Sequence, residues 1–385
     1  MAPPRMPEAV IGLDVGKLSH WACVATRDGE ILLSAPVANR EGDLDSLFGR
    51  FPDALVVVDQ SRNIGALALA RAKAAGMSAA YLPGLAAHGA ARLFAGDAKT
   101  NERDAMVIAK TALGIPDALL PVGDPGPTVA AARALAAQRN FLTCENTRSK
   151  NRLRSILLES CPAFEALVDL SDGPQLRLMA SLGGAWSVAD AGPRMAAALT
   201  RGAARGEIEA LVRSTASSTR PDAAAIAAED RAVRLLARRI SENSAEIDVI
   251  TAEISALLEG DDTYRCLLTV PGIGPKTASE LAISIDIEDF PSHDRLASYC
   301  GLAPRNRQSG TSISSVTASR QGNKRLKNLL IFSCNCLTRT EGRWGDYYAR
   351  CRERGMPHGK ALKALARKRL KVIYAIMRDR VPYAA

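Results

Sequence analysis

The chain has 385 residues, a formal net charge of +9, 47% hydrophobic residues and 24% charged residues. This length allows two or three domains with buried cores, and this composition is typical of a folded protein rather than a disordered one. No signal peptide is evident and no apolar run approaches the ~20 residues that span a membrane, so we expect a cytoplasmic protein without membrane contacts, whose eight cysteines are free thiols.

The first 125 residues read as alternating strands and helices. Three strands come first, and the turn Asp28-Gly29 joins the second to the third as a hairpin. A continuous apolar run at 55–58 indicates a buried central strand. We therefore predict an RNase H-like α/β sheet in a domain spanning 1–125. The expected strands are 9–15, 21–25, 31–34, 55–58 and 79–82, and the expected helices are 64–75 and 99–112.

Acidic residues mark this predicted sheet. Asp14 lies within the first strand, Asp59 ends the central strand, and Asp104 lies on the helix that begins near Lys99. A single carboxylate at a strand end is more often a surface residue, but two at otherwise apolar strand positions are costly to bury without a partner. Spaced carboxylates that gather a divalent metal ion suit phosphodiester chemistry, so we assign all three to a metal and catalytic site.

The region 126–260 is predicted to be helical. It follows a Pro-rich linker at 116–127 and begins with a helix at 128–158, where Arg148 and Lys150 are candidates for a phosphate backbone or for a solvated face. Short helices or an insertion follow. Between 233 and 257, apolar residues repeat every seven positions, which predicts a coiled coil. Its partner is either a second subunit, which we slightly favour, or the 128–158 helix.

The third predicted domain, 261–385, is mainly helical. Its segment L-L-T-V-P-G-I-G-P-K-T-A-S-E-L is a helix-hairpin-helix-like pattern. Gly272 and Gly274 leave backbone N–H groups free at a helix N-terminus, next to Lys276, and such a turn can hold a DNA phosphate. The alternative is a tight turn between helices without a ligand.

Ser309 is the candidate nucleophile. It precedes Gly310 in an expected polar loop, where Arg305 and Arg307 can stabilise negative charge on a phosphate. The alternative is an ordinary turn residue among several serines. Lys324, Arg325 and Lys327 lie at an expected helix start and are candidates for binding the DNA or RNA backbone. From Arg343 to Arg380, twelve Lys/Arg stand against three Asp/Glu, which indicates a nucleic-acid partner.

Together these segments resemble the IS110 (IS one-ten) family of insertion-sequence transposases, also called bridge recombinases. The resemblance rests on G-L-D-V-G-K, on A-K-T-x-x-x-D-A ending at Ala105, and on P-G-I-G-P…Y-C-G-L-A-P-R…Q-S-G…G-N-K-R-L-K. It implies a RuvC-like domain with a DEDD acidic quartet that binds Mg²⁺ or Mn²⁺, and a C-terminal domain whose serine attacks DNA. It further implies donor and target double-stranded DNA, a noncoding guide RNA, a homo-oligomer (dimer or tetramer), and a bacterial, nucleoid-associated location.

One position departs from the family pattern. Asp14, Asp59 and Asp104 match the first, second and fourth acids, but Asn101 stands where the third is expected. An Asn offers a carbonyl oxygen without negative charge. Asp97, one helical turn earlier, is a possible substitute, whereas Glu102 points about 100° away.

Other functions remain in competition at this point. A Holliday-junction resolvase with the same fold would need the acids but not Ser309. A decayed, non-catalytic nucleic-acid-binding relative is the third possibility, because of Asn101. A DDE transposase is disfavoured, since it gives Ser309 no role. No phosphate-binding loop is evident, so we expect no nucleotide cofactor.

Overall fold

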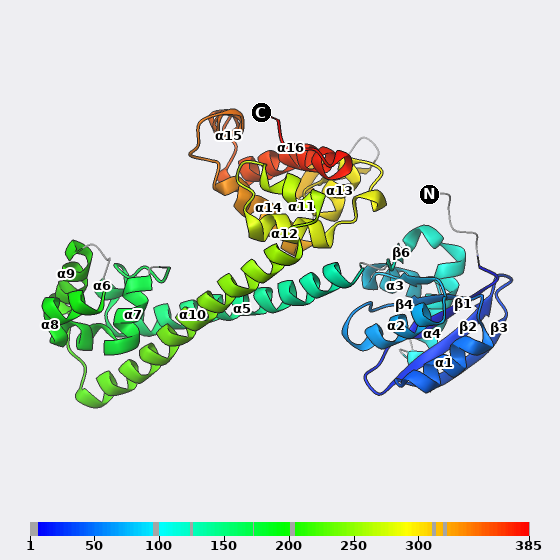
Figure 1. Cartoon of the computed structure of the whole chain (residues 1–385), viewed down its shortest axis with the longest axis horizontal. Helices are drawn as coiled ribbons and strands as arrows, with labels where there is room; N and C mark the ends of the chain where they lie inside the picture. Colours follow the sequence, from blue (N-terminus) through cyan, green and yellow to red (C-terminus); the bar gives the residue numbers. More distant parts are fainter. Residues whose placement is uncertain are drawn as a thin grey trace. The chain divides into compact units, whose positions relative to one another are not determined.

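The computed structural model of the chain describes residues 7–94, 100–123, 126–171, 173–200, 205–309, 313–318 and 322–384, and gives the backbone alone for 305–309 and 313–318. The chain divides into two compact units, with the boundary between Asp124 and Pro125. The first unit is α/β and the second almost entirely helical (Figure 1). The prediction of an α/β N-terminal domain followed by a helical remainder is therefore confirmed. The finer division at residue 260 stays a prediction.

A six-stranded sheet forms the centre of the N-terminal unit. Its order is β3-β2-β1-β4-β5-β6; β1 is antiparallel to β2 and parallel to β4. The predicted hairpin is present, with Gly29 at φ 88° in its turn. Part of the predicted linker at 116–127 instead joins the sheet edge, because β6 pairs with β5. The strands are β1 (Ala9–Asp14), β2 (Ser19–Thr26), β3 (Ile31–Ala38), β4 (Leu55–Val58), β5 (Ala79–Tyr81) and β6 (Leu120–Pro121).

Helices cover both faces of this sheet. Successive residues of a strand point to opposite faces, so Ile11 and Leu13 pack with α1 and α2, whereas Val10 packs with α4. Two apolar cores result, one on each side. The elements are α1 (Glu41–Arg50), η1 (Asn63–Gly65), α2 (Ala66–Ala74), α3 (Gly84–Ala91), α4 (Asn101–Gly114) and η2 (Pro116–Ala118).

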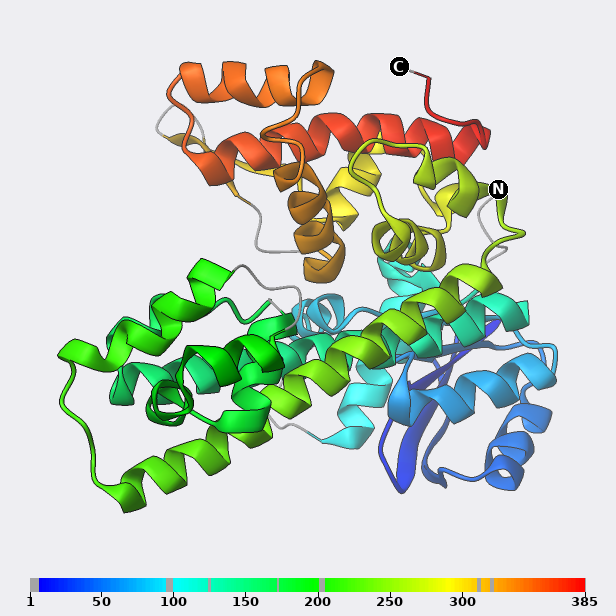
Figure 2. The same cartoon turned by 60° about the vertical axis from the view of Figure 1, so that its left-hand side comes forward.

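Two long helices, α5 (Gly126–Ser160) and α10 (Ala223–Leu257), lie side by side in the second unit (Figures 1 and 2). The helix predicted over 233–257 lies within α10. Its first heptad row is buried at Val233, Ile240 and Ile254. Within this chain the partner of α10 is α5, with a polar contact from Asn146 Nδ2 to Ser244 Oγ at 3.0 Å. A second subunit is not needed to cover this row.

Each end of the α5–α10 pair carries its own apolar core. At one end, Leu153 and Ile240 pack with short helices: α6 (Pro162–Glu165), α7 (Gly173–Leu182), α8 (Ala185–Leu199), α9 (Arg205–Arg213) and η3 (Ser214–Ser217). At the other end, Ala136 and Ile254 join the core of the C-terminal helices. The short helices expected between 160 and 228 are thus present.

The C-terminal helices pack around α16 and α12. Leu281, Leu330 and Leu365, from three helices, are fully buried there. No helix in the described ranges is long and apolar enough to span a bilayer. The elements are α11 (Asp262–Leu268), α12 (Pro275–Ser284), η4 (Ile287–Asp289), α13 (His293–Tyr299), β7 (Pro304–Ser309), β8 (Ile313–Ala318), α14 (Lys324–Asn335), α15 (Arg343–Glu353) and α16 (His358–Asp379).

Candidate functional site

Two of the predicted acids lie where the central parallel strands end. β1 and β4 pair with Leu13 opposite Val58, so the next residues, Asp14 and Asp59, follow in the same register. Both are half-buried. The carboxyl ends of such strands are where α/β proteins gather ligands. The sheet therefore brings two acids that are far apart in the sequence to the carboxyl ends of two neighbouring strands.

Helix α4 carries the third acid. Its N-cap is Thr100, whose Oγ1 accepts a hydrogen bond from the Arg103 N–H at 3.2 Å. Asp104 follows in the first turn, next to Ala105, which packs over Gly12 of β1. A Cβ atom on Gly12 would lie 2.5 Å from the Ala105 carbonyl oxygen. The missing side chain thus allows the close approach that fixes Asp104 relative to β1.

The carboxylate of Asp59 lies where negative charge is unfavourable. Burial raises its pKa, and the nearby Asp104 carboxylate raises it further. The Val15 N–H, which donates to Asp59 Oδ1 at 3.5 Å, lowers the pKa in part. A divalent cation relieves such repulsion. In the described parts of the chain, no three His, Cys, Asp or Glu side chains gather closely enough to hold a metal ion. Mg²⁺ commonly binds through one or two carboxylates and keeps several waters, so these oxygen donors fit it.

The degenerate position, Asn101, is the exposed first residue of α4. Asp97, the possible substitute, lies outside the described residues. Glu102 is engaged elsewhere: its Oε1 accepts a hydrogen bond from Ser34 Oγ on β3 at 3.3 Å. The metal-binding roles of Asn101 and Asp97 stay predictions.

A buried histidine, which the sequence analysis missed, anchors the loop that follows Asp14. His20 is 1% exposed. Its Nδ1 accepts from the Gly16 N–H at 3.1 Å, so its Nε2 carries the proton and donates to Asn39 Oδ1 at 3.1 Å. Asn39 Nδ2 donates to the Lys17 carbonyl oxygen at 3.2 Å. Burial lowers the pKa of His20, which keeps the ring neutral and this network intact.

Ser309 lies at the end of a strand, where a polar loop was predicted. It is the last residue of β7, and Ser309 pairs with Ile313 at the tip of the β7–β8 hairpin. The prediction failed because P-R-N-R-Q-S has no apolar alternation, although the β-branched residues of β8 suit a sheet. The side chains of Arg305, Arg307 and Ser309 lie outside what the structure describes. Their backbone places all three on β7.

The predicted helix-hairpin-helix turn is present between α11 and α12. Gly272 adopts φ 75°, and a Cβ there would lie 3.0 Å from the Ser333 carbonyl oxygen. Gly274 precedes Pro275 as the N-cap of α12, with no side-chain cap. Gly272, Gly274 and Lys276 are all solvent-exposed. The start of α12 is therefore exposed to solvent beside a lysine.

A buried arginine, which the sequence analysis missed, supports this turn through hydrogen bonds. Arg369 is 1% exposed. It donates to the Pro271 carbonyl oxygen and, at 2.8 Å, to Ser333 Oγ, which in turn donates to the Gly272 carbonyl oxygen. Its guanidinium lies 6.0 Å from the Trp344 ring centroid. Arg369 thus couples α16 and α14 to the turn.

A second buried charge cluster joins α12 to α5 and α14. Glu280, 3% exposed, lies 3.5 Å from Arg139 and 2.6 Å from Arg325. Arg325 also donates to the Ala136 carbonyl oxygen at 3.0 Å. Although Lys276 is exposed at the surface, partial desolvation of its ammonium group, with the charges of Arg139 and Arg325, lowers its pKa. One carboxylate thus faces three cations, so the cluster favours an added anion.

The other candidate nucleic-acid residues lie on helix surfaces. Lys324 is exposed at the start of α14, and Lys327, one turn on, is half-buried. On α5, Arg148 is exposed and paired with Glu145, and Lys150 is half-buried. Contacts of these residues with nucleic acid stay predictions.

Comparison with known proteins places both units in one family. A family model described as transposase, the DEDD type of IS110 elements, matches residues 11–162. A second model, the transposase IS116/IS110/IS902 family, matches residues 264–349. The two matches include the acidic edge of the sheet and the segment that carries Ser309.

Full-length relatives agree with these matches. The chain is 34% identical to the insertion element IS110 43.6 kDa protein of Streptomyces coelicolor, over 96% of this chain and 94% of the relative. It is 31% identical to the IS116 44.8 kDa protein of Streptomyces clavuligerus, over the same shares. A pilin gene-inverting protein of Moraxella bovis is 37% identical over 30% of this chain and 37% of its own length. This chain belongs to the IS110/IS116 family of insertion-sequence transposases.

Proposed function

We propose that this transposase is a metal-dependent, RNA-guided recombinase that exchanges DNA strands through a covalent link to Ser309. The observation that carries the proposal is that Asp14 and Asp59 follow paired strands in the same register, with the Asp104 carboxylate of α4 near enough to raise the Asp59 pKa, in a chain of this family. The relative named for inverting a pilin gene supports site-specific recombination.

We further propose that the N-terminal unit is RuvC-like. The antiparallel hairpin followed by parallel strands, in the order β3-β2-β1-β4-β5, is the arrangement expected of an RNase H-like sheet. Asp14, Asp59 and Asp104 would hold Mg²⁺ or Mn²⁺, with Asn101 contributing at most a neutral oxygen. The bound ion would supply Lewis-acid stabilisation of charge on the scissile phosphate.

In the strand transfer proposed for Ser309, one phosphate ester bond forms as another breaks. The Ser309 oxygen attacks the phosphorus and forms a phosphoserine ester, while the bond from phosphorus to the 3′ oxygen breaks. The proton lost by the Ser309 hydroxyl is regained by the leaving 3′ oxygen. Attack of another 3′-hydroxyl on the phosphoserine reverses these steps and joins new strands. Because one ester replaces another throughout, no nucleotide cofactor is needed.

The partners follow from the same proposal. Donor and target double-stranded DNA supply the strands, and a noncoding RNA would select both by base pairing. A dimer or tetramer would allow the N-terminal unit of one subunit to act with Ser309 of another. The exposed turn at Gly272 and Gly274, next to Lys276, supports phosphate contacts in the second unit.

The test is a search for the covalent adduct. Labelled donor and target DNA are incubated with protein, co-expressed flanking RNA and Mg²⁺, and adducts are mapped by peptide mass spectrometry. We expect an adduct on Ser309, its loss in Ser309→Ala with binding retained, and its persistence in Ser314→Ala, a matched variant on the facing strand. An adduct that persists in Ser309→Ala would reject the serine mechanism. Cleavage without any adduct would favour a resolvase that uses water.

A further inference from the structure

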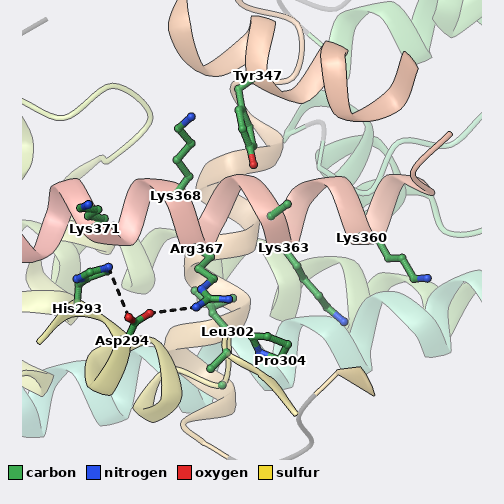
Figure 3. Close-up of a pocket in the computed structure, with 13 residues that line it drawn as sticks. His293, Asp294, Leu302, Pro304, Tyr347, Lys360, Lys363, Arg367, Lys368 and Lys371 are labelled. Atoms are coloured by element: carbon green, nitrogen blue, oxygen red, sulfur yellow. Dashed lines mark hydrogen bonds and ion pairs between the residues drawn. The ribbon is translucent and has the colours of Figure 1, made fainter. Parts of the chain in front are cut away.

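A basic pocket of about 740 Å³ lies beside the segment that leads into β7. One wall is α16, which contributes Lys360, Lys363, Arg367, Lys368 and Lys371; the opposite wall contains Asp294 and residues 301–304 (Figure 3). Five cations therefore line this pocket against one carboxylate. None of the sites described above uses it.

The cations form a stripe along one side of α16. Positions 360, 363, 367 and 371 fall within about 80° of the helix circumference, since each residue turns 100°. The opposite side, including Leu362, Leu365 and Ile376, is buried in the C-terminal core. The buried side fixes the rotation of α16 and keeps the stripe turned to the pocket. Over its 11 residue steps the stripe is about 16 Å long.

Most of this positive charge is not neutralised within the protein. Arg367 pairs with Asp294 at 3.0 Å, and this hydrogen bond holds the Asp294 pKa below its usual value. Lys368 lies outside the stripe and points toward Tyr347, another lining residue, with its Nζ 4.4 Å from the Tyr347 ring centroid (Figure 3). As far as the structure describes the chain, neither Lys360, Lys363 nor Lys371 forms an ion pair. Lys360 and Lys363 point, with Arg367, toward the side where Pro304 lies (Figure 3).

We propose that this pocket binds phosphates of duplex DNA that flank, a few nucleotides away, the bond that Ser309 attacks. Pro304, which lines the pocket, is the first residue of β7, and Ser309 is the last. Five strand residues span about 16 Å, and a DNA strand advances about 3.4 Å per nucleotide. The pocket therefore contacts phosphates about five nucleotides from the scissile one. This inference rests on the proposed role of Ser309.

The chemistry of the lining favours a phosphate backbone over a base edge. Lysines on flexible stems act as point charges, which bind phosphates without reading sequence. The other lining residues include Leu302, Ala303 and Pro304, which donate no side-chain hydrogen bonds to a base. Two more can form hydrogen bonds: His293, whose Nε2 lies 3.8 Å from Asp294 Oδ2, and Tyr347, whose ring lies against Lys368. We therefore expect the pocket to set the position and affinity of DNA and to leave sequence choice to other parts of the complex.

The test compares a triple variant, Lys360→Gln, Lys363→Gln and Lys371→Gln, with a charge-matched control, Arg231→Gln, Arg238→Gln and Arg239→Gln on the exposed surface of α10. Dissociation constants of the full chain for an arbitrary 40-bp DNA duplex and an RNA hairpin of similar length are measured against salt. If all three lysines contact phosphates, the slope of log affinity against log salt falls by about 2.7 for DNA. At 0.1 M salt this is a loss of up to about 500-fold.

Four results bear on the inference, and the last of them separates it from the proposed function. Equal losses in the triple variant and the control would overturn it, because general charge would explain both. A loss confined to the RNA hairpin would overturn the assignment to DNA. On DNA that forms the Ser309 adduct, ethylating phosphates about five nucleotides from the adduct should block the wild-type protein. Absence of any adduct, with the slope change present, would reject the serine mechanism but keep the pocket.

Discussion

Gly12→Ala is expected to move the third acid away from the other two. The new Cβ would lie 2.5 Å from the Ala105 carbonyl oxygen and 2.6 Å from the Ala109 nitrogen, whereas ordinary contacts begin at 3.4 Å. Helix α4 must therefore retreat from β1 by about 0.9 Å, the difference of the first and last distances. Asp104 moves with the helix, while Asp14, two residues after Gly12, stays with the strand.

Two magnitudes follow from this displacement. Overpacking of a close-packed core costs about 1–3 kcal/mol, which lowers the melting temperature of a domain of this size by about 5 °C or more. A misplacement near 1 Å at a catalytic site costs about 100-fold in rate. Thermal unfolding measures the first, and Mg²⁺-dependent adduct formation measures the second.

Gly49→Ala in α1 is the matched control. A Cβ at Gly49 meets no atom within 4 Å, and alanine in a helix is about 0.5–1 kcal/mol more stable than glycine. The two glycine substitutions should therefore have opposite signs. If Gly12→Ala melts at or above the temperature of the wild type, the contact of α4 with β1 is not what fixes Asp104, and our account of the site is wrong.

Three further predictions concern single side chains. Burial holds the pKa of His20 below 6.5, so as pH falls the unfolded chain takes up this proton before the folded chain does. The free energy of unfolding, measured in denaturant titrations, should therefore fall as pH drops below about 6.5. In His20→Gln this fall should be smaller. Glu280→Gln leaves buried cations without a counter-charge and should lower the free energy of unfolding by about 3–5 kcal/mol in chemical denaturation. The control, Asp190→Asn at an exposed pair with Arg220, should lower it by under about 1 kcal/mol. Equal losses would contradict our description of the cluster. Asn101→Asp should tighten Mg²⁺ binding and increase cleavage, and unchanged activity across a Mg²⁺ titration would remove Asn101 from the metal site.

The strands of the N-terminal unit were predictable where pattern and turn chemistry agree. The run Leu55–Val58 is β4 with the predicted bounds, and Asp28-Gly29 is the hairpin turn. Helix α1, by contrast, was missed, because glycines 42 and 49 interrupt its short sequence and weaken the helical signal. Strand β7 was missed because its polar sequence resembles a loop.

In the candidate site, too, residues marked by the local sequence were predictable, whereas residues brought together only by packing were not. Asp14 and Asp59 were found because each lies at the end of an apolar strand, a property of the local sequence. The partners of Glu280 were not found, since Arg139 lies 141 positions away and only the packing of α5 on α12 brings them together. Arg369 was counted only as one of the twelve Lys/Arg between Arg343 and Arg380. Only its rotation toward the buried side of α16 shows that it supports the Pro271–Gly272 turn.

The paired helices α5 and α10 set the distance between the two apolar cores of the second unit. Each helix has 35 residues and is therefore about 52 Å long, with one apolar core at each end. Seven residues added to both helices would lengthen the pair by about 10 Å and rotate the far core by only about 20°, because seven residues make nearly two turns. The separation of the two cores can therefore change in steps of one heptad without a change in the packing of either core.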